Sequence, residues 1–319
     1  GTFGSGDTTL SYTNGTYLMW SPRKGAFHAG TVSGNQWANG RTGESSFSMG
    51  RNSTVTAGGF YSAAFGDSSR VTCTASFAMG HKCYTTILSG VDDGGSAAMG
   101  DSCVVTFTRS VAMGYHCRSN GGYSFGGYNV TNGGTGFALG SYNTTYNGSG
   151  IALGSHASTN SHSGCFIFAD ASSTTQTNVP ADNQFVVRAS GGVIFYSDSS
   201  ATIGVTLFPG SGSWASVSDR NKKENFYTPD GEEILSRIAG LKITSWNYKS
   251  QPAYIRHIGP MAQDFYKAFK LGESRKRISM VDIDGVTLLA LKTLYARVAI
   301  LDASFEAMHQ LKSEAKNID

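Results

Sequence analysis

The chain has 319 residues and a formal net charge of +3, and it combines 41 Gly and only 6 Pro with 12% aromatic and 15% charged residues. This composition excludes simple disorder and collagen and favours a repetitive β architecture. The chain lacks the basic field that nucleic-acid binding needs and any apolar run of about 20 residues, so we expect no nucleic-acid partner and no membrane insertion. Because the sequence begins at Gly1 rather than Met, we expect it to be a fragment.

A short peptide recurs between residues 41 and 170. The copies read SFSMG, SAAFG, SFAMG, SAAMG, SVAMG, GFALG and GIALG, ending at Gly50, Gly66, Gly80, Gly100, Gly114, Gly140 and Gly154. Three of the spacings are 14 residues, and YSFGG around Gly126 is a degenerate copy. The longer gap between Gly80 and Gly100 predicts an insertion around Val91 to Gly95. A fixed period of this kind predicts a stack of similar turns.

Within each copy, bulky and tiny residues alternate. Phe77 and Met79 would face one side of a strand, whereas Ala78 and Gly80 would face the other. The remaining copies follow the same rule. Alternation with period two predicts a β-strand, and the tiny face leaves room for close approach of another backbone. One such turn cannot bury its apolar face alone, so successive turns must cover each other.

The period and the small-residue pattern resemble the head repeats of trimeric autotransporter adhesins, the YadA-like left-handed parallel β-roll. The resemblance covers residues 41–170 and implies a trimer of rolls packed side by side, with residues 1–40 as an N-terminal connecting segment. The alternative is a monomeric β-solenoid, which would need caps at both ends. The sequence shows no segment that we recognise as such a cap.

Five cysteines lie in this region, at Cys73, Cys83, Cys103, Cys117 and Cys165. An odd number without Cys-x-x-Cys or His-x-x-x-His spacing indicates neither a disulfide framework nor a zinc site. Three of them occupy one repeat position where other copies have Ser, Asn or Ala, so we interpret them as core fillers. His81 with Cys83, and His116 with Cys117, are the alternative as metal ligands. We expect no metal and no cofactor.

Residues 171–217 leave the repeat and are expected to form a β-rich stem, because NQFVVRASGGVIFYS and IGVTLFPGSGSW are β-rich runs separated by turn residues. Composition changes at Ser218: only five glycines and no cysteine follow. This change predicts a domain boundary.

Residues 218–319 have the pattern of an α+β domain. Helices are predicted at 231–238 and 261–269, a strand at 243–248, and a long helix from Asp284 or Gly285 onward. The long helix carries a heptad seam, which favours a three-helix bundle over a single packed amphipathic helix. The seam consists of Leu291, Leu294, Val298, Leu301, Phe305 and Met308.

Five motifs of this region occur in a fixed order. They are SDRNKKENF from Ser218, WNY from Trp246, HIGPMAQDF from His257, VDIDGV from Val281 and the terminal heptad helix. Together they resemble the endosialidase-type intramolecular chaperone domain at the C-terminus of phage tail fibres, tailspikes and neck appendages. The resemblance covers residues 218–319 and implies a domain that helps the upstream chain trimerise and fold and then cuts itself off.

The resemblance also implies the catalytic residues. The bond cut lies between Val217 and Ser218, with Ser218 as nucleophile and Lys223 as general base, and Asp219 matches the motif. Arg220 and Lys222 could disfavour the charged form of the base by repulsion. On a continuous helix, residue 223 would point away from residue 218 and Lys222 would face it. Hence the segment is non-helical, or a neighbouring chain completes the site, or Lys222 is the base.

The sequence therefore predicts a homotrimeric virion tail-fibre or appendage fragment with a self-cleaving chaperone, a single-turnover serine endopeptidase without a metabolic substrate. Its partners would be its own copies and a host-cell surface receptor, with glycans among the candidates. The alternative is a cell-surface trimeric adhesin head with an uncleaved trimerisation module. A glycan-degrading enzyme is disfavoured, because Asp67, Asp92, Asp93 and Asp101 form no evident carboxylate pair. Exposed tyrosines could stack on sugars or simply cover the roll; they are Tyr61, Tyr84, Tyr115, Tyr123, Tyr128, Tyr142 and Tyr146.

Overall fold

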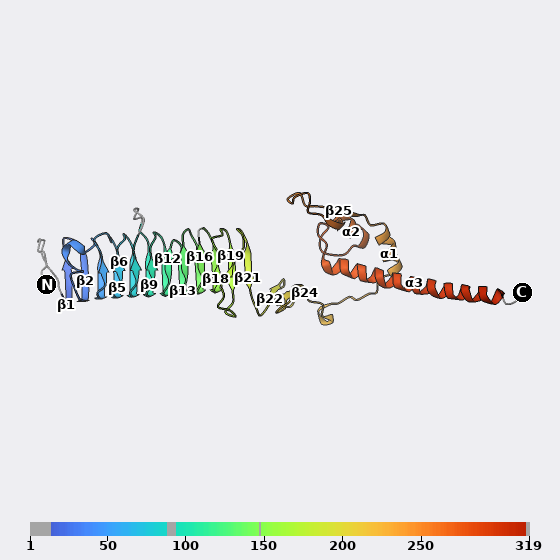
Figure 1. Cartoon of the computed structure of the whole chain (residues 1–319), viewed down its shortest axis with the longest axis horizontal. Helices are drawn as coiled ribbons and strands as arrows, with labels where there is room; N and C mark the ends of the chain where they lie inside the picture. The colour runs from blue at the N-terminus through green and yellow to red at the C-terminus, as the bar shows by residue number, and fades with distance from the viewer. Residues whose placement is uncertain (1–13, 88–93, 147, 317–319) are drawn as a thin grey trace. The chain divides into compact units, whose positions relative to one another are not determined.

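A computed structural model describes residues 14–87, 94–146 and 148–316. The chain forms two compact units, Gly1–Val217 and Ser218–Asp319, and each is considered by itself. Figure 1 shows the first unit as a row of stacked strands and the second as short elements around one long helix.

The first unit is a β-solenoid built on two sheets. The larger sheet has twelve strands and the smaller one nine, and from β3 to β20 each turn contributes one strand to each sheet. The strands of the larger sheet are β1 Gly15–Ser21, β2 Ala26–Val32, β3 Phe47–Arg51, β5 Ala63–Asp67, β7 Phe77–His81, β9 Ala97–Asp101, β11 Val111–Tyr115, β13 Tyr123–Gly127, β15 Phe137–Ser141, β17 Ile151–Ser155, β19 Phe166–Ala169 and β21 Phe185–Arg188. Those of the smaller sheet are β4 Thr54–Val55, β6 Arg70–Val71, β8 Tyr84–Thr85, β10 Val104–Val105, β12 Arg118–Asn120, β14 Val130–Asn132, β16 Thr144–Tyr146, β18 Ala157–Ser158 and β20 Thr177–Asn178.

The strands pair in parallel with the repeat peptides in register. Gly80 of β7 lies opposite Gly100 of β9, so the longer connection between them does not shift the register. The predicted insertion there falls mostly on residues 88–93, outside the described part of the chain. The degenerate copy around Gly126 is strand β13 and pairs like the others.

The inward positions of the repeat peptides hold small side chains. Ala78, Ala98 and Ala112 are fully buried, and Ser48 and Ser124 occupy the same inward position in other turns. The bulky members of the repeat point outward instead, so that Met79 is 44% exposed. The predicted alternation is therefore present, with the tiny face turned to the core. Two sheets can lie this close together because no large side chain separates them.

In strands β3 to β17 of the larger sheet, the next-to-last residue is glycine because the next turn approaches too closely for a Cβ atom. At Gly114, φ is +124°, and an added Cβ would lie 2.0 Å from the carbonyl oxygen of Gly126. The same contact recurs from turn to turn. A side chain here would meet backbone that cannot move, so the repeat requires Gly.

The inward carbonyl of that glycine accepts a hydrogen bond from the turn before it. The donor is Ser69 Oγ in one turn (3.0 Å to Gly80 O), Cys103 Sγ in another (3.3 Å to Gly114 O) and Asn129 Nδ2 in a third (2.8 Å to Gly140 O). Ser, Cys or Asn can occupy this position because the side chain of each supplies a hydrogen-bond donor of similar reach. All five cysteines are free and buried, as expected of core fillers.

Structures that the sequence analysis did not recognise as caps finish both ends of the solenoid. At the N-terminal end, β1 and β2 form an antiparallel hairpin that joins the larger sheet, and His28 and Trp37 are buried beside it. At the other end, Arg188 donates hydrogen bonds to the carbonyls of Thr175 and Ser155 and to Asp170. The paired strands thus extend beyond residues 41–170 on both sides.

A three-stranded antiparallel sheet follows the solenoid. It consists of β22 Val193–Tyr196, β23 Gly204–Leu207 and β24 Trp214–Ser216. Its apolar residues are exposed, with Phe195 at 53% and Trp214 at 52%. β24 ends one residue before Val217, whose backbone N–H still donates to Gly204 O at 3.3 Å.

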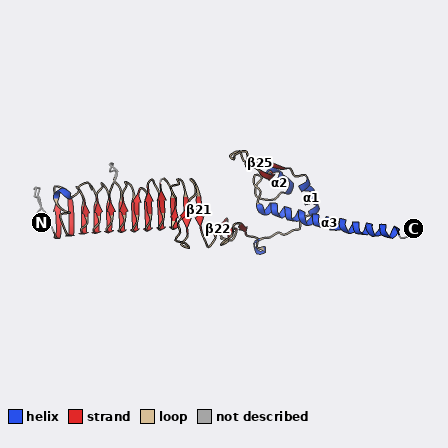
Figure 2. Ribbon diagram, in the orientation of Figure 1, coloured by secondary structure: helices blue, strands red, loops and turns tan. Residues whose placement is uncertain are grey.

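The second unit is a small α+β arrangement around its long helix (Figure 2). Its elements are α1 Gly231–Ala239, the antiparallel pair β25 Ile243–Trp246 and β26 His257–Pro260, α2 Ala262–Phe269 and α3 Met280–Lys316. Phe265, Phe269 and Val286 form its core, against which Ile234 and Ile283 pack. Because this packing includes Ile283, α3 begins at Met280, earlier than the sequence pattern predicted.

The predicted fold class is confirmed. A β-solenoid occupies the N-terminal part of the chain, and a mixed α/β region that ends in a long helix follows it.

Candidate functional site

The segment that starts the second unit is a single tight turn. Asp219 caps a 3-10 helix, Arg220–Lys222, by accepting a hydrogen bond from Asn221 N at 2.9 Å. Lys223 then returns to an extended conformation, with φ −125° and ψ 152°. The segment is therefore not a continuous α-helix, which is the first of the three alternatives left open by the sequence.

This turn brings Lys223 back to Ser218. The ammonium Nζ of Lys223 donates a hydrogen bond to Ser218 Oγ at 2.7 Å. Asp219 and Arg220 support the geometry, because the Lys222 and Lys223 backbone N–H groups donate to their carbonyl oxygens. A serine hydroxyl at hydrogen-bond distance from a lysine is the arrangement that Ser/Lys nucleophilic chemistry needs.

Within one chain, this pair is open to water. Every residue from Val217 to Tyr227 is exposed. In general a lysine acts as a base near neutral pH only when burial or a neighbouring cation lowers its pKa. Arg220 and Lys222 supply nearby positive charge in the sequence, but the single chain supplies no burial.

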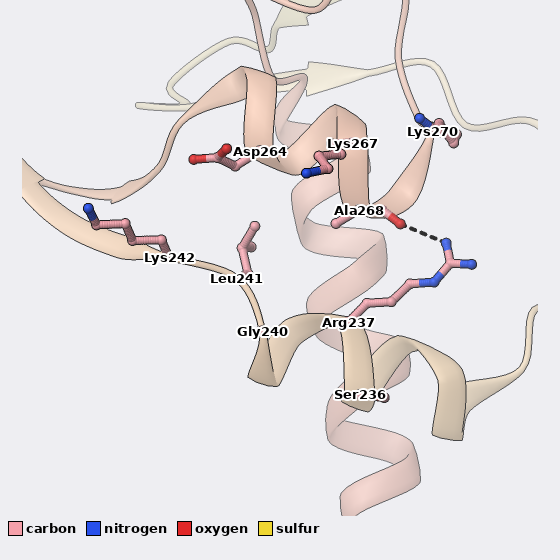
Figure 3. Close-up of a pocket in the computed structure, with 9 residues that line it drawn as sticks. All are labelled: Ser236, Arg237, Gly240, Leu241, Lys242, Asp264, Lys267, Ala268 and Lys270. Atoms are coloured by element: carbon pink, nitrogen blue, oxygen red, sulfur yellow. Dashed lines mark hydrogen bonds between the residues drawn. The ribbon is translucent and has the colours of Figure 1, made fainter.

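The body of the second unit holds a cationic pocket of about 600 Å³ between α1 and α2. Arg237, Lys242, Lys267 and Lys270 line it, with Asp264 as the one carboxylate. Figure 3 shows Arg237 reaching from α1 to the carbonyl of Ala268 at 2.7 Å, which ties the two helices together. No residue of 218–223 lines this pocket, so it is separate from the Ser218 pair.

The solenoid carboxylates in the described residues are structural. Asp67 pairs with Arg51, and Asp101 lies 3.0 Å from the His81 ring and accepts from Ser102. These hydrogen bonds hold the pKa of both carboxyls below the usual range. Asp92 and Asp93 lie outside the described part of the chain.

The fold separates the two members of each proposed metal-ligand pair. His81 contacts Asp101 on the surface while Cys83 points into the core, and His116 stacks on Tyr128 while Cys117 is buried. Across residues 14–87, 94–146 and 148–316, no group of three or more His, Cys, Asp or Glu residues could hold a metal ion.

One feature of the surface was not predicted from the sequence. Among the tyrosines singled out, Tyr128 and Tyr142 stack on each other, and His116 and His156 continue the stack at its two ends. Their spacing of 12, 14 and 14 residues follows the repeat, and this spacing is the signal that could have revealed the stack.

Comparison with known families identifies the class of domain in the second unit. Residues 218–271 match the family model described as chaperone of endosialidase. No curated protein and no solved structure matches the chain. The C-terminal part of the chain therefore carries a domain of this intramolecular-chaperone class, and a β-solenoid precedes it.

The family is one of autoproteolytic serine peptidases, typical of phage tail proteins that process themselves. The match begins at Ser218 and includes the WNY and HIGPMAQDF motifs, but it ends at Leu271, short of VDIDGV and the terminal helix that the sequence analysis had also included. In the described residues, no helix is long and apolar enough to cross a membrane.

Proposed function

We propose that the chain is a fragment of a homotrimeric phage tail fibre or appendage, whose residues 218–319 drive folding of the upstream β-structure and then cut the chain between Val217 and Ser218. The observation that carries the proposal is the 2.7 Å hydrogen bond between Lys223 Nζ and Ser218 Oγ, at the first residue of the matched domain and of the second compact unit. Residues 41–170 would be a YadA-like head and residues 171–217 a stem.

The chemistry follows from the position of the nucleophile. Ser218 supplies both the attacking oxygen and the nitrogen of the bond to be cut, so cleavage is an N-to-O acyl shift. Neutral Lys223 takes the hydroxyl proton, Ser218 Oγ bonds to the Val217 carbonyl carbon, and the C–N bond breaks as the amine receives that proton. Water then hydrolyses the ester, leaving a Val217 carboxylate and a free Ser218 amine.

Asp219 has a positioning role in this scheme. Its carboxylate caps the 3-10 turn that returns Lys223 to Ser218. Lys223 Nζ donates to the Ser218 hydroxyl, and neither Arg220 nor Lys222 makes a hydrogen bond to it in the described part of the chain. We assign Lys223 as the base for this reason, and Lys222 as a supporting charge.

Three exposed apolar surfaces support the trimer. On the solenoid, the outward face of the larger sheet carries Met49 at 43%, Leu139 at 46% and Phe185 at 65% exposure. The stem sheet is exposed in the same way. Every residue of the α3 heptad seam is at least 47% exposed. Contiguous apolar surface of this extent marks an interface, and domains of this family act in trimers.

Trimer formation also explains how the exposed Ser218 and Lys223 pair becomes reactive. Neighbouring chains that pack around residues 217–223 would exclude water and favour the neutral amine. Cleavage would then follow assembly, and the loss of the covalent link would trap the folded fibre kinetically. The mature fragment would belong to the virion tail and face a receptor on the host-cell surface.

Intact mass of the denatured protein tests the proposal. The wild type is expected to give two fragments, 1–217 and 218–319, whereas Ser218→Ala and Lys223→Ala stay full length. Lys222→Ala is the matched control and is expected to be cut. Light scattering on each variant checks that it forms a trimer.

An ester intermediate can be tested separately. With Ser218→Cys the acyl shift gives a thioester, and hydroxylamine should convert Val217 to a hydroxamate detectable by mass. A wild-type trimer that remains full length would overturn the peptidase function and favour the alternative, an adhesin head with an uncleaved trimerisation module.

A further inference from the structure

One edge of the solenoid carries a continuous row of aromatic rings, which we call the aromatic strip. It consists of Tyr115, His116, Tyr128, Tyr142 and His156. Ring centroids follow each other at 5.2, 4.7 and 4.8 Å from His116 to His156, with planes within 11° of parallel. Tyr115 lies edge-on to Tyr128 at 5.2 Å.

The backbone fixes this row at the spacing of the solenoid turns. Each stacked residue donates its backbone N–H to the preceding turn, as Tyr128 does to Tyr115 O at 2.8 Å and Tyr142 to Gly127 O at 2.9 Å. Strand spacing in a sheet is about 4.8 Å. The polar ring edges are therefore repeated at nearly constant intervals along a straight line.

The residues of the row are in an unfavourable backbone conformation. Positive φ values of 51°, 56°, 57° and 59° occur at His116, Tyr128, Tyr142 and His156. Earlier turns place Asn52, Ser68, Lys82 and Ser102 at this corner, and Asn tolerates the left-handed region better than a bulky ring does. Folding alone would favour Asn here, so the rings require a different explanation.

The exposed groups are polar and uncharged. Tyr128 and Tyr142 are 40% and 47% exposed, and the Tyr142 hydroxyl makes no hydrogen bond within the described part of the chain. The positions next to the stacked rings are the small residues Gly127, Ser141 and Ser155. No Lys, Arg, Asp or Glu occupies either column between residues 115 and 156.

Farther toward the N-terminus the same edge carries charged residues, four of which form two pairs. Arg51 pairs with Asp67, and His81 pairs with Asp101. Those four groups are thus paired with each other. In the strip, the Tyr128 hydroxyl bonds to Tyr115 and His156 Nδ1 lies 2.8 Å from Ser155 Oγ, whereas the exposed Tyr142 hydroxyl is left for an uncharged partner rich in hydroxyls.

We propose that the aromatic strip binds a neutral polysaccharide in extended conformation, lying along the solenoid axis. One turn of the solenoid advances by nearly the length of one pyranose unit in an extended β-linked chain, so successive sugars meet equivalent ring edges. Tyrosine hydroxyls and histidine nitrogens donate to and accept from the sugar hydroxyls. The proposal rests on the assignment of the head as the part that meets the host receptor, and it names the chemical class of that receptor.

Titration of the full chain with cellohexaose, a straight neutral β-1,4-linked glucan, tests the proposal. Tyrosine fluorescence or NMR should report binding with a dissociation constant of about 1 mM. Maltohexaose, which is α-linked and curved, should bind at least tenfold more weakly. Tyr142→Phe keeps the stacked ring and should weaken cellohexaose binding about fivefold, the loss of one hydrogen bond.

Tyr142→Asn separates binding from folding. Because Asn suits the positive φ, this variant should melt at the same or a higher temperature while binding falls at least tenfold. Lys82→Asn, at the same corner of an earlier turn, is the control and should bind normally. Absence of cellohexaose binding at millimolar concentration, or equal binding by Tyr142→Asn, would overturn the proposal.

Two further readouts separate alternatives. If Tyr142→Asn changes the oligomeric state and leaves sugar binding intact, the strip is an interface between copies, and the glycan proposal is wrong. Cleavage at Val217 is measured by mass on the same samples, so a failure of processing and a failure of glycan binding are distinguishable.

Discussion

Acid should destabilise the N-terminal end of the solenoid through one buried histidine. His28 is fully buried, its ring lies 5.2 Å from Trp37, and neither ring nitrogen has a hydrogen-bond partner among the described residues. Burial lowers the pKa of His28 from 6.5 to about 4. The unfolded state therefore binds a proton between pH 6.5 and 4 that the folded state excludes, and stability falls as pH drops through this window.

A shift of this size corresponds to about 3 kcal/mol, at about 1.4 kcal/mol per pH unit. The full penalty is reached below pH 4 and is absent above pH 6.5. His28→Leu removes the titratable imidazole and replaces it with an apolar side chain of similar size.

Thermal melting of the wild type and His28→Leu at pH 7 and pH 4 measures this effect. The difference in stability between the two proteins should change by about 3 kcal/mol in favour of the variant on acidification. Use of the difference cancels the contribution of carboxylates such as Asp101, whose pKa is lowered. Identical pH dependence of the two proteins, or an NMR titration of His28 near pH 6.5, would refute the reasoning.

Substitutions at Gly114, Cys103 and Arg188, with matched controls where the chain offers them, test the solenoid. Gly114→Ala places a Cβ 2.0 Å from Gly126 O and should cost at least 3 kcal/mol or prevent folding, whereas Gly127→Ala, with open space around it, should melt like the wild type. Cys103→Ser keeps the hydrogen bond to Gly114 O and should change stability by less than about 1 kcal/mol, but Cys103→Val should cost about 1–3 kcal/mol in urea unfolding because the carbonyl loses its donor. Arg188→Met should increase proteolysis of the last turn, since four backbone carbonyls lose a donor; unchanged protection would contradict this clamp.

The repeated part of the fold could be predicted because its determinants are local. Alternation in peptides such as SFAMG and the recurrence of glycine report the strand and the close approach of turns directly. The ends could not be predicted in the same way. His28, Trp37 and Arg188 act through contacts with residues 9 to 33 positions away, and none of them repeats.

The candidate site was likewise only partly predictable from the sequence. The order of motifs from Ser218 onward pointed to the chaperone domain, but helix geometry could not choose between Lys222 and Lys223. In the structure, Asp219 caps the N-terminus of a 3-10 turn that stops at Lys222, and Lys223 then returns to Ser218, which is the geometry that favours Lys223 in the proposed function. The start of α3 at Met280 was missed because packing of Ile283 and Val286, not their intrinsic propensity, extends the helix.

The hydrogen bonds to the glycine carbonyls also set the order in which the turns can be completed while the chain is being synthesised. The side chain of Cys103 in one turn finds its acceptor, Gly114 O, only when the following strand is in place. During translation the most recently made turn therefore always has an unsatisfied donor, until the next 14 or so residues leave the ribosome. A nascent head would keep an unfinished edge throughout synthesis, and that edge closes only when the turn held by Arg188 has emerged.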